Sequence, residues 1–121
     1  MSKVTVLIVD DEIEMHWALE KALHQDGYKI LKATNGTEGL QLLASQEVSV
    51  VLLDYKMPGM TGLEVLEQIR KQWTDLPVIF MTGYSSIPTA TDSIARGTTA
   101  YISKPFRLDE IKDTLKKVLY N

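Results

Sequence analysis

The chain has 121 residues, a formal net charge of −3 and no cysteine. This length suits one domain with a buried core, and the missing thiols exclude a disulfide framework and a cysteine-ligated metal site. Because no basic block occurs, we expect no direct nucleic-acid binding by this segment. No apolar run approaches the roughly 20 residues of a membrane span, and no signal-peptide pattern opens the chain. We therefore expect a cytoplasmic protein that does not enter the membrane.

Apolar runs rich in β-branched residues alternate with amphipathic helical patterns. The first strand is predicted over residues 4–9, and the helical pattern after it ends at Asp26-Gly27. A weaker second strand is predicted over 28–33, and a short helix follows over 35–45. The third strand ends at Asp54 after an almost wholly apolar run, which is typical of a strand buried on both faces of a parallel sheet.

The second half of the chain repeats this alternation. Thr61 and Glu64 match a capping box that opens a third helix, and this helix is predicted to run up to Trp73. The remaining predicted elements are a strand over 78–81, a helix over 85–96, a strand over 100–102 and a helix over 108–119. Such alternation predicts an α/β fold with helices on both faces of a parallel sheet. Right-handed crossovers then bring the C-terminal ends of all strands to one edge.

Polar side chains follow most of the predicted strands. In chain order they are Asp10, Asp11 and Glu12 after the first strand, Asp54 after the third, Thr82 after the fourth and Lys104 after the fifth. Neither histidine falls at a strand end, so the donor set is all oxygen, which favours Mg²⁺, and Mn²⁺ would also fit. Aspartate is a known phosphoryl-accepting nucleophile. Lys104 and Thr82 are the groups that can contact phosphoryl oxygens.

Each of these signals also has an ordinary structural explanation. Asp10 and Asp11 suit the N-terminus of a helix, where an acid can cap the helix and favour its dipole. Glu12 is expected to be an exposed acid of the first turn. His16 and His24 are expected to be solvated helix residues without a role. Agreement between several strand ends at one edge, rather than any single residue, favours a functional site.

Four motifs make the chain resemble the receiver domain of two-component response regulators. They occur in the family's order, each after a predicted strand, and together they cover essentially the whole chain. The motifs are Val9-Asp10-Asp11-Glu12, Leu53-Asp54-Tyr55-Lys56-Met57-Pro58-Gly59-Met60-Thr61-Gly62, Met81-Thr82-Gly83 and Ser103-Lys104-Pro105-Phe106. The resemblance implies a flavodoxin-like three-layer sandwich whose five-stranded parallel sheet has the order 2-1-3-4-5 with five helices. It also implies that residues 1–121 are one receiver domain.

The resemblance further implies a role for each site residue. Asp54 is the phosphoacceptor, and Asp54, Lys104 and Thr82 form the catalytic set. Asp54, Asp11 and the backbone carbonyl of Lys56 are the direct Mg²⁺ ligands. Asp10 acts on the metal through a bound water.

Two further features are carried over from the family. Thr82 and Tyr101 occupy its switch positions, although Tyr101 also has the ordinary explanation of a half-buried strand tyrosine. The Lys104-Pro105 bond is expected to be cis, since proline is the residue before which a cis bond is cheap.

The implied function is to take a phosphoryl group from a sensor histidine kinase or a histidine phosphotransfer protein. Mg²⁺-dependent hydrolysis then removes the group, and no external substrate is processed. An aspartyl-phosphate phosphatase would carry a second acid two residues after the nucleophile, but Lys56 stands there. The alternative is a receiver-like interaction module that works without phosphorylation.

The expected partners follow from the same resemblance. An output domain or partner is expected on the face formed by the fourth helix, fifth strand and fifth helix, and a phosphorylation-dependent dimer is a further expectation. The sequence identifies neither the kinase nor the input signal. It also leaves open whether the receiver stands alone or belongs to a longer regulator.

Overall fold

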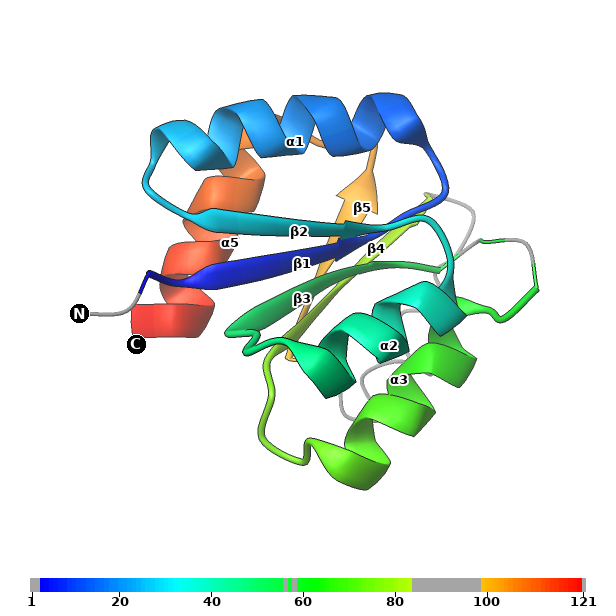
Figure 1. The fold of residues 1–121 in the computed structure, drawn as a ribbon. Coiled ribbons are helices and arrows are strands. Elements are labelled where there is room, and N and C mark those ends of the chain that lie inside the picture. Colours follow the sequence, from blue (N-terminus) through cyan, green and yellow to red (C-terminus); the bar gives the residue numbers. More distant parts are fainter. Residues whose placement is uncertain (1–2, 56, 58, 84–98, 121) are drawn as a thin grey trace.

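The computed structural model describes residues 3–55, 57, 59–83 and 99–120, with the side chain of Thr82 outside this description. Strands and helices alternate along the chain (Figure 1). The elements are β1 (Thr5–Val9), α1 (Ile13–Gln25), β2 (Lys29–Ala33), α2 (Gly36–Ser45), β3 (Val50–Asp54), α3 (Gly62–Gln72), β4 (Val78–Gly83), β5 (Ala100–Lys104) and α5 (Leu108–Tyr120). The fourth helix that the sequence predicts over 85–96 lies outside the described residues.

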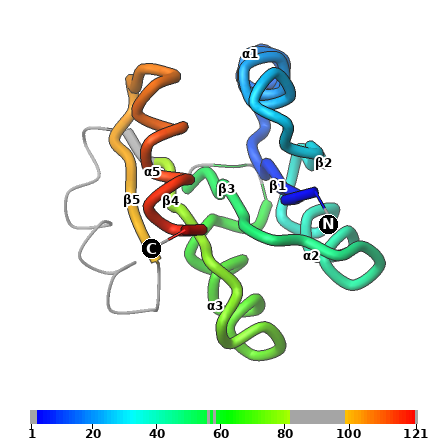
Figure 2. Tube along the Cα trace, turned by 90° about the vertical axis from the view of Figure 1, so that its left-hand side faces the viewer, coloured from blue at the N-terminus to red at the C-terminus, as the bar shows by residue number. Residues whose placement is uncertain are grey.

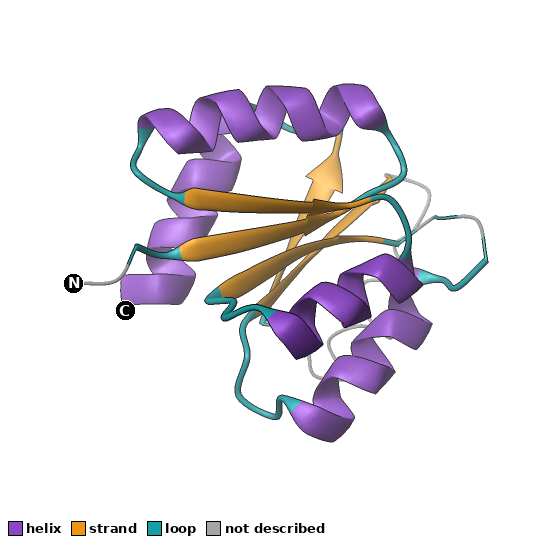
Figure 3. Ribbon diagram, in the orientation of Figure 1, coloured by secondary structure: helices purple, strands orange, loops and turns teal. Residues whose placement is uncertain are grey.

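The strands form one five-stranded sheet in the order β2-β1-β3-β4-β5, and every neighbouring pair is parallel. This is the predicted 2-1-3-4-5 order. Figure 3 shows the strands converging so that their C-terminal ends lie along one edge of the sheet. The register pairs Val9 with Leu53 and Asp54 with Met81, so the acidic segment after β1 and the end of β3 are close neighbours.

The sheet is the middle of three layers. Figures 1 and 2 show α1 and α5 against one face and α2 and α3 against the other. Alternate side chains of β1 enter the two cores, because successive residues of a strand point to opposite faces. Val6 and Ile8 belong to the core under α1 and α5, whereas Leu7 and Val9 belong to the core under α2 and α3. This arrangement is the predicted flavodoxin-like sandwich, and it explains why β1 and β3 are buried along their whole length.

The helix starts show how the sequence fixes local structure near the edge that carries the acids. At the start of α3, the Thr61 hydroxyl accepts the Glu64 N–H and the Glu64 carboxylate accepts the Thr61 N–H, as the capping box predicts. At the start of α1, the N-cap residue Glu12 makes no side-chain cap bond. The acids before α1 therefore engage other partners, which are described with the site.

Strand β5 is longer than the sequence predicts, because it continues to Lys104, which pairs with Gly83 of β4. Lys104 is thus held by the sheet itself and not by a loop. Among the described helices, none is both long enough and apolar enough to cross a membrane.

Candidate functional site

The acids that follow β1 and end β3 form one cluster. Asp10, Asp11 and Asp54 each offer a carboxylate oxygen, and these oxygens all lie within 4.8 Å of one another. Asp10 is fully buried and Asp54 is only 4% exposed, whereas Asp11 is exposed. Carboxylates packed this closely repel one another unless a cation lies among them.

Lys104 supplies a cation to this cluster. Its ammonium Nζ lies 3.1 Å from Oδ2 of Asp10 and 3.1 Å from Oδ1 of Asp54, and donates a hydrogen bond to each. Nζ is also 3.4 Å from Oε1 of Glu12. Because Lys104 ends β5 while the acids follow β1 and end β3, the cluster combines groups from three strands of the sheet.

Burial and neighbouring charges change the pKa values of Asp54 and Lys104. Burial is the largest cause that raises the pKa of Asp54 to about 6, and the neighbouring Asp10 raises it further, while Lys104 partly opposes both. For Lys104, burial alone would lower the pKa, but Asp54 and Asp10 overcome this effect and raise it above its ordinary value. The lysine therefore stays charged. A divalent cation beside Asp54 would favour the ionised form of the Asp54 carboxyl.

Asp10 is held through its backbone as well as its side chain. Its N–H donates to the carbonyl of Ala33 at 3.0 Å, and its Oδ1 accepts the Glu12 N–H at 2.9 Å. Its own carbonyl oxygen lies 2.5 Å from Nε2 of His16. These contacts fix the orientation of a buried carboxylate that faces Lys104.

The prediction for His16 is wrong. This histidine is not solvated but only 5% exposed, with its ring bonded to the Asp10 carbonyl. The signal was present in the sequence, because His16 precedes Leu19 by three residues and Leu23 by seven, which places it on the buried face of α1. Treating the imidazole as a polar residue hid that position. His24, on the last turn, is exposed as predicted.

Gly62 is a second residue whose importance the sequence reasoning missed. A Cβ on Gly62 would lie 2.5 Å from the carbonyl oxygen of Asp54 and 2.7 Å from Cα of Tyr55. The Gly62 N–H also donates to the Tyr55 carbonyl at 2.8 Å. The first residue of α3 thus packs directly on the backbone that carries Asp54, and only glycine leaves enough space.

Of the other predicted site residues, the structure describes some, and others lie outside its described part. Tyr101 is half-buried in β5, and its hydroxyl accepts a hydrogen bond from Ser103 at 3.1 Å. The Lys104–Pro105 peptide bond is cis, as expected. The side chain of Thr82 and the carbonyl of Lys56 lie outside the described part of the chain. Glu12 is exposed as expected, but it also contacts Lys104.

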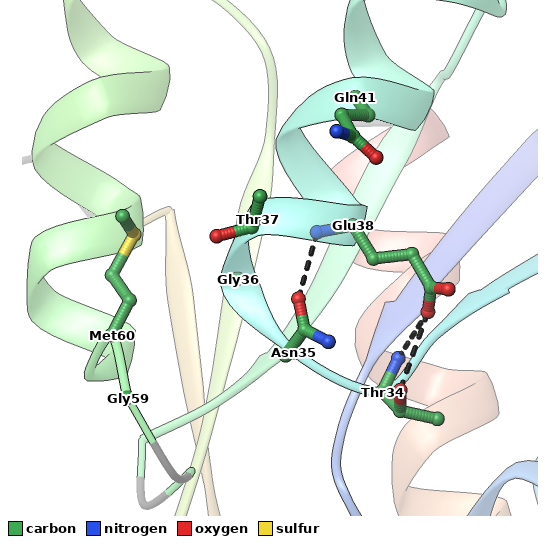
Figure 4. Close-up of a pocket in the computed structure, with 8 residues that line it drawn as sticks. All are labelled: Thr34, Asn35, Gly36, Thr37, Glu38, Gln41, Gly59 and Met60. Atoms are coloured by element: carbon green, nitrogen blue, oxygen red, sulfur yellow. Dashed lines mark hydrogen bonds between the residues drawn. The ribbon is translucent and has the colours of Figure 1, made fainter.

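A hollow of about 760 Å³ lies at the same edge, between the start of α2 and the residues before α3 (Figure 4). Asn35 Oδ1 accepts the Glu38 N–H at 2.8 Å, and a Glu38 carboxylate oxygen accepts the Thr34 N–H at 2.6 Å. These bonds explain Asn35 and Glu38 as polar residues that organise the start of α2. The acids of the cluster are not among the residues that line this hollow, and we assign the hollow no chemistry.

Comparison with known proteins agrees with this geometry. The sequence model described as response regulator receiver domain matches residues 6–116. Sporulation initiation phosphotransferase F of Bacillus subtilis (strain 168) is 34% identical over 119 residues, which are 98% of this chain and 96% of that protein. The DNA-binding transcriptional regulator NtrC of Escherichia coli (strain K12) is 41% identical over 110 residues, which are 91% of this chain.

The chain spans only part of some relatives. It covers 24% of NtrC and 52% of the uncharacterized transcriptional regulatory protein YkoG of Bacillus subtilis (strain 168), which is 39% identical over 119 residues. Among solved structures, the CheY-like response regulator receiver domain protein from Methanospirillum hungatei JF-1 superposes with a TM-score of 0.93 at 31% identity. That comparison covers 98% of this chain and 94% of the solved one. The chain therefore belongs to the response regulator receiver domains of two-component signal transduction.

Proposed function

We propose that residues 1–121 form one receiver domain in which Asp54 accepts a phosphoryl group from the phosphohistidine of a sensor histidine kinase or a histidine phosphotransfer protein. The observation that carries this proposal is the contact between the buried Asp54 carboxylate and Lys104 inside a cluster of acids. In the transfer, an oxygen of Asp54 bonds to phosphorus, the bond from phosphorus to the donor imidazole breaks, and its electron pair stays on that nitrogen. Phosphoryl transfer depends mainly on positioning and charge neutralisation, which this arrangement offers.

The donor set fits Mg²⁺, and Mn²⁺ could use the same oxygens. Receiver domains bind Mg²⁺ at an acidic pocket, and the cluster of Asp10, Asp11 and Asp54 has that character. We propose that Asp54, Asp11 and the Lys56 carbonyl hold the ion directly, with Asp10 acting through a bound water. When bound, the ion offsets the negative charge of the incoming phosphoryl group.

The remaining residues act on the phosphoryl group and on its signal. Lys104 transfers its hydrogen bond from the Asp54 carboxylate to a phosphoryl oxygen, and the Thr82 hydroxyl donates to another. Thr82 and Tyr101 then change position together and alter the face that the family resemblance assigns to β5, α5 and the predicted fourth helix. That face would bind an output domain, a partner or a second phosphorylated copy of the chain.

The phosphoryl group leaves by hydrolysis without an external substrate. Water attacks phosphorus, the bond between phosphorus and the Asp54 oxygen breaks, and inorganic phosphate departs. The residue two positions after Asp54 is Lys56, which cannot serve as the acid that a phosphatase needs to protonate a leaving group. We therefore assign the chain self-phosphorylation and autodephosphorylation only.

Intact-mass measurement after incubation with acetyl phosphate and Mg²⁺ tests the proposal. The wild-type chain should gain one phosphoryl group, and EDTA or Asp54→Asn should prevent the gain. Asp113→Asn removes an exposed acid of α5 and is the matched control, which should be labelled like the wild type. Full labelling of Asp54→Asn would refute the assignment of Asp54. An unlabelled wild type would favour the phosphorylation-independent interaction module.

A further inference from the structure

The imidazole of His16 lies beneath the acid cluster, on the first turn of α1. Its Nε2 is 2.5 Å from the carbonyl oxygen of Asp10, and the residue is only 5% exposed. A carbonyl oxygen can only accept a hydrogen bond, so Nε2 must carry the proton. The ring is therefore a donor aimed at the backbone of an acid in the cluster.

The contact matters because the Asp10 carbonyl lies in the peptide group that joins the two acids. The carbonyl of Asp10 and the N–H of Asp11 belong to one peptide group, which is planar. A donor that fixes the carbonyl oxygen of Asp10 therefore also fixes the direction in which the chain enters Asp11. The N–H and carboxylate of Asp10 are already held by Ala33, Glu12 and Lys104.

The need for such a donor follows from how α1 begins. The helix starts at Ile13, and the bond from the His16 N–H reaches the carbonyl of Glu12, two residues after Asp10. The carbonyl of Asp10 therefore precedes the helical bonding pattern while belonging to a fully buried residue. A buried carbonyl without a donor is costly, so the peptide between the two acids would turn to find one.

We propose that His16 is a positioning residue for the Asp10–Asp11 pair, holding the peptide plane between them so that both carboxylates face the same cation. The inference rests on the proposed Mg²⁺ site but concerns a different residue and a different contact. His16 does not touch the metal or the phosphoryl group, and it acts only through the backbone of Asp10.

Three substitutions separate this role from simple packing. His16→Leu keeps an apolar volume but removes the donor, whereas His16→Gln retains an N–H at a similar distance from the backbone. His24→Leu removes the exposed histidine of the same helix and is the control. If His16→Leu does not fold, His16→Met replaces it, since methionine also fills the space without an N–H donor.

Titration with Mg²⁺, followed through the backbone amide signals of residues 10–12, gives the dissociation constant of each variant. We expect His16→Leu to weaken Mg²⁺ binding about 10-fold or more, as loss of a group that orients a metal ligand commonly does. His16→Gln should stay within about 3-fold of the wild type, because it restores the donor. His24→Leu should bind Mg²⁺ like the wild type.

The same spectra in EDTA give a readout that needs no metal. The Asp11 amide signal should move in His16→Leu and return toward its wild-type position in His16→Gln. Wild-type affinity in His16→Leu, or equal losses in the leucine and glutamine variants, would overturn the inference. If the wild type binds no Mg²⁺, the proposed function fails instead. The positioning role is then decided by the metal-free Asp11 signal, and an unmoved signal in His16→Leu refutes it.

Discussion

At the scale of single residues, Lys104 holds together charges that would otherwise repel one another. Its ammonium contacts both buried carboxylates at 3.1 Å. We expect Lys104→Met to slow the labelling of Asp54 by acetyl phosphate about 100-fold or more, as loss of one charge-stabilising donor does in many active sites. The measurement is the initial rate of phosphorylation in saturating Mg²⁺.

The matched control for this variant is Lys112→Met. Lys112 also pairs with an aspartate, because its Nζ lies 3.4 Å from Asp26, but this pair links α5 to the end of α1 and lies apart from the cluster. The control should keep the wild-type rate. A Lys104→Met chain labelled as fast as the control would show that the lysine does not assist transfer.

Asp54 should also make stability depend on pH. Its pKa is raised from the ordinary 3.8 to about 6, so between these pH values the folded chain binds more protons than the unfolded chain. The free energy of unfolding therefore falls as pH rises through this window and levels off above it. The shift corresponds to about 2–3 kcal/mol, which Asp54→Asn should recover because the amide carries no charge.

Urea unfolding of both chains in EDTA at several pH values checks this prediction. The stability advantage of Asp54→Asn should grow between about pH 4 and pH 6 and then stay constant, as expected for a single titrating carboxyl. An advantage that does not change over this range would mean that the acid is not held in its neutral form by burial.

The strand pattern predicted where Asp10, Asp54 and Lys104 would meet, because each lies at or just after the end of a predicted strand. It did not predict which atoms would pair. Glu12 was expected to be only an exposed acid, yet its carboxylate contacts Lys104, and its N–H holds Asp10. The helical pattern places His16 on the buried face of α1, but it does not show the bond from the imidazole to the Asp10 carbonyl.

At the scale of elements, the starts of α2 and α3 offer a comparison between two glycines in equivalent positions. A Cβ on Gly62 would meet backbone atoms of Asp54 and Tyr55, whereas a Cβ on Gly36 would meet side-chain atoms of Val65 and Met60. Backbone within a buried sheet moves less easily than a side chain. Gly62→Ala should therefore destabilise the fold by about 1–3 kcal/mol, the usual cost of overpacking, and by more than Gly36→Ala.

Urea unfolding measures both glycine variants in the same way, and each adds one methyl group to the first turn of a helix. Labelling with acetyl phosphate adds a second readout, since only Gly62 packs on the Asp54 backbone. Equal losses of stability, or a Gly36→Ala chain that loses labelling more than Gly62→Ala, would contradict the role assigned to the start of α3.

The capping box of α3 was predictable because both partners lie within one turn of the same segment. The strand order was not predictable from the alternation of elements, because several orders satisfy right-handed crossovers. It followed only from the resemblance to a known family. The extension of β5 to Lys104 was also missed, since the polar residues at its end do not continue the apolar pattern.

At the scale of the whole molecule, the fold assembles the acid cluster from segments that are far apart in the sequence. The acids come from the central strands β1 and β3, and the lysine comes from the edge strand β5. Unfolding separates the two acidic segments, so an ion that needs carboxylates from both binds only the folded chain. Mg²⁺ should therefore stabilise the fold by mass action.

Thermal unfolding at increasing Mg²⁺ concentration measures this coupling. At about 100 times the dissociation constant, the wild type should gain about 2.7 kcal/mol, and EDTA should reverse the gain. Asp11→Asn removes the charge of one exposed carboxylate of the cluster and should lose most of the response, whereas Asp113→Asn on α5 should keep it. If both variants responded like the wild type, the stabilising ion would bind elsewhere, because only the first substitution alters the cluster.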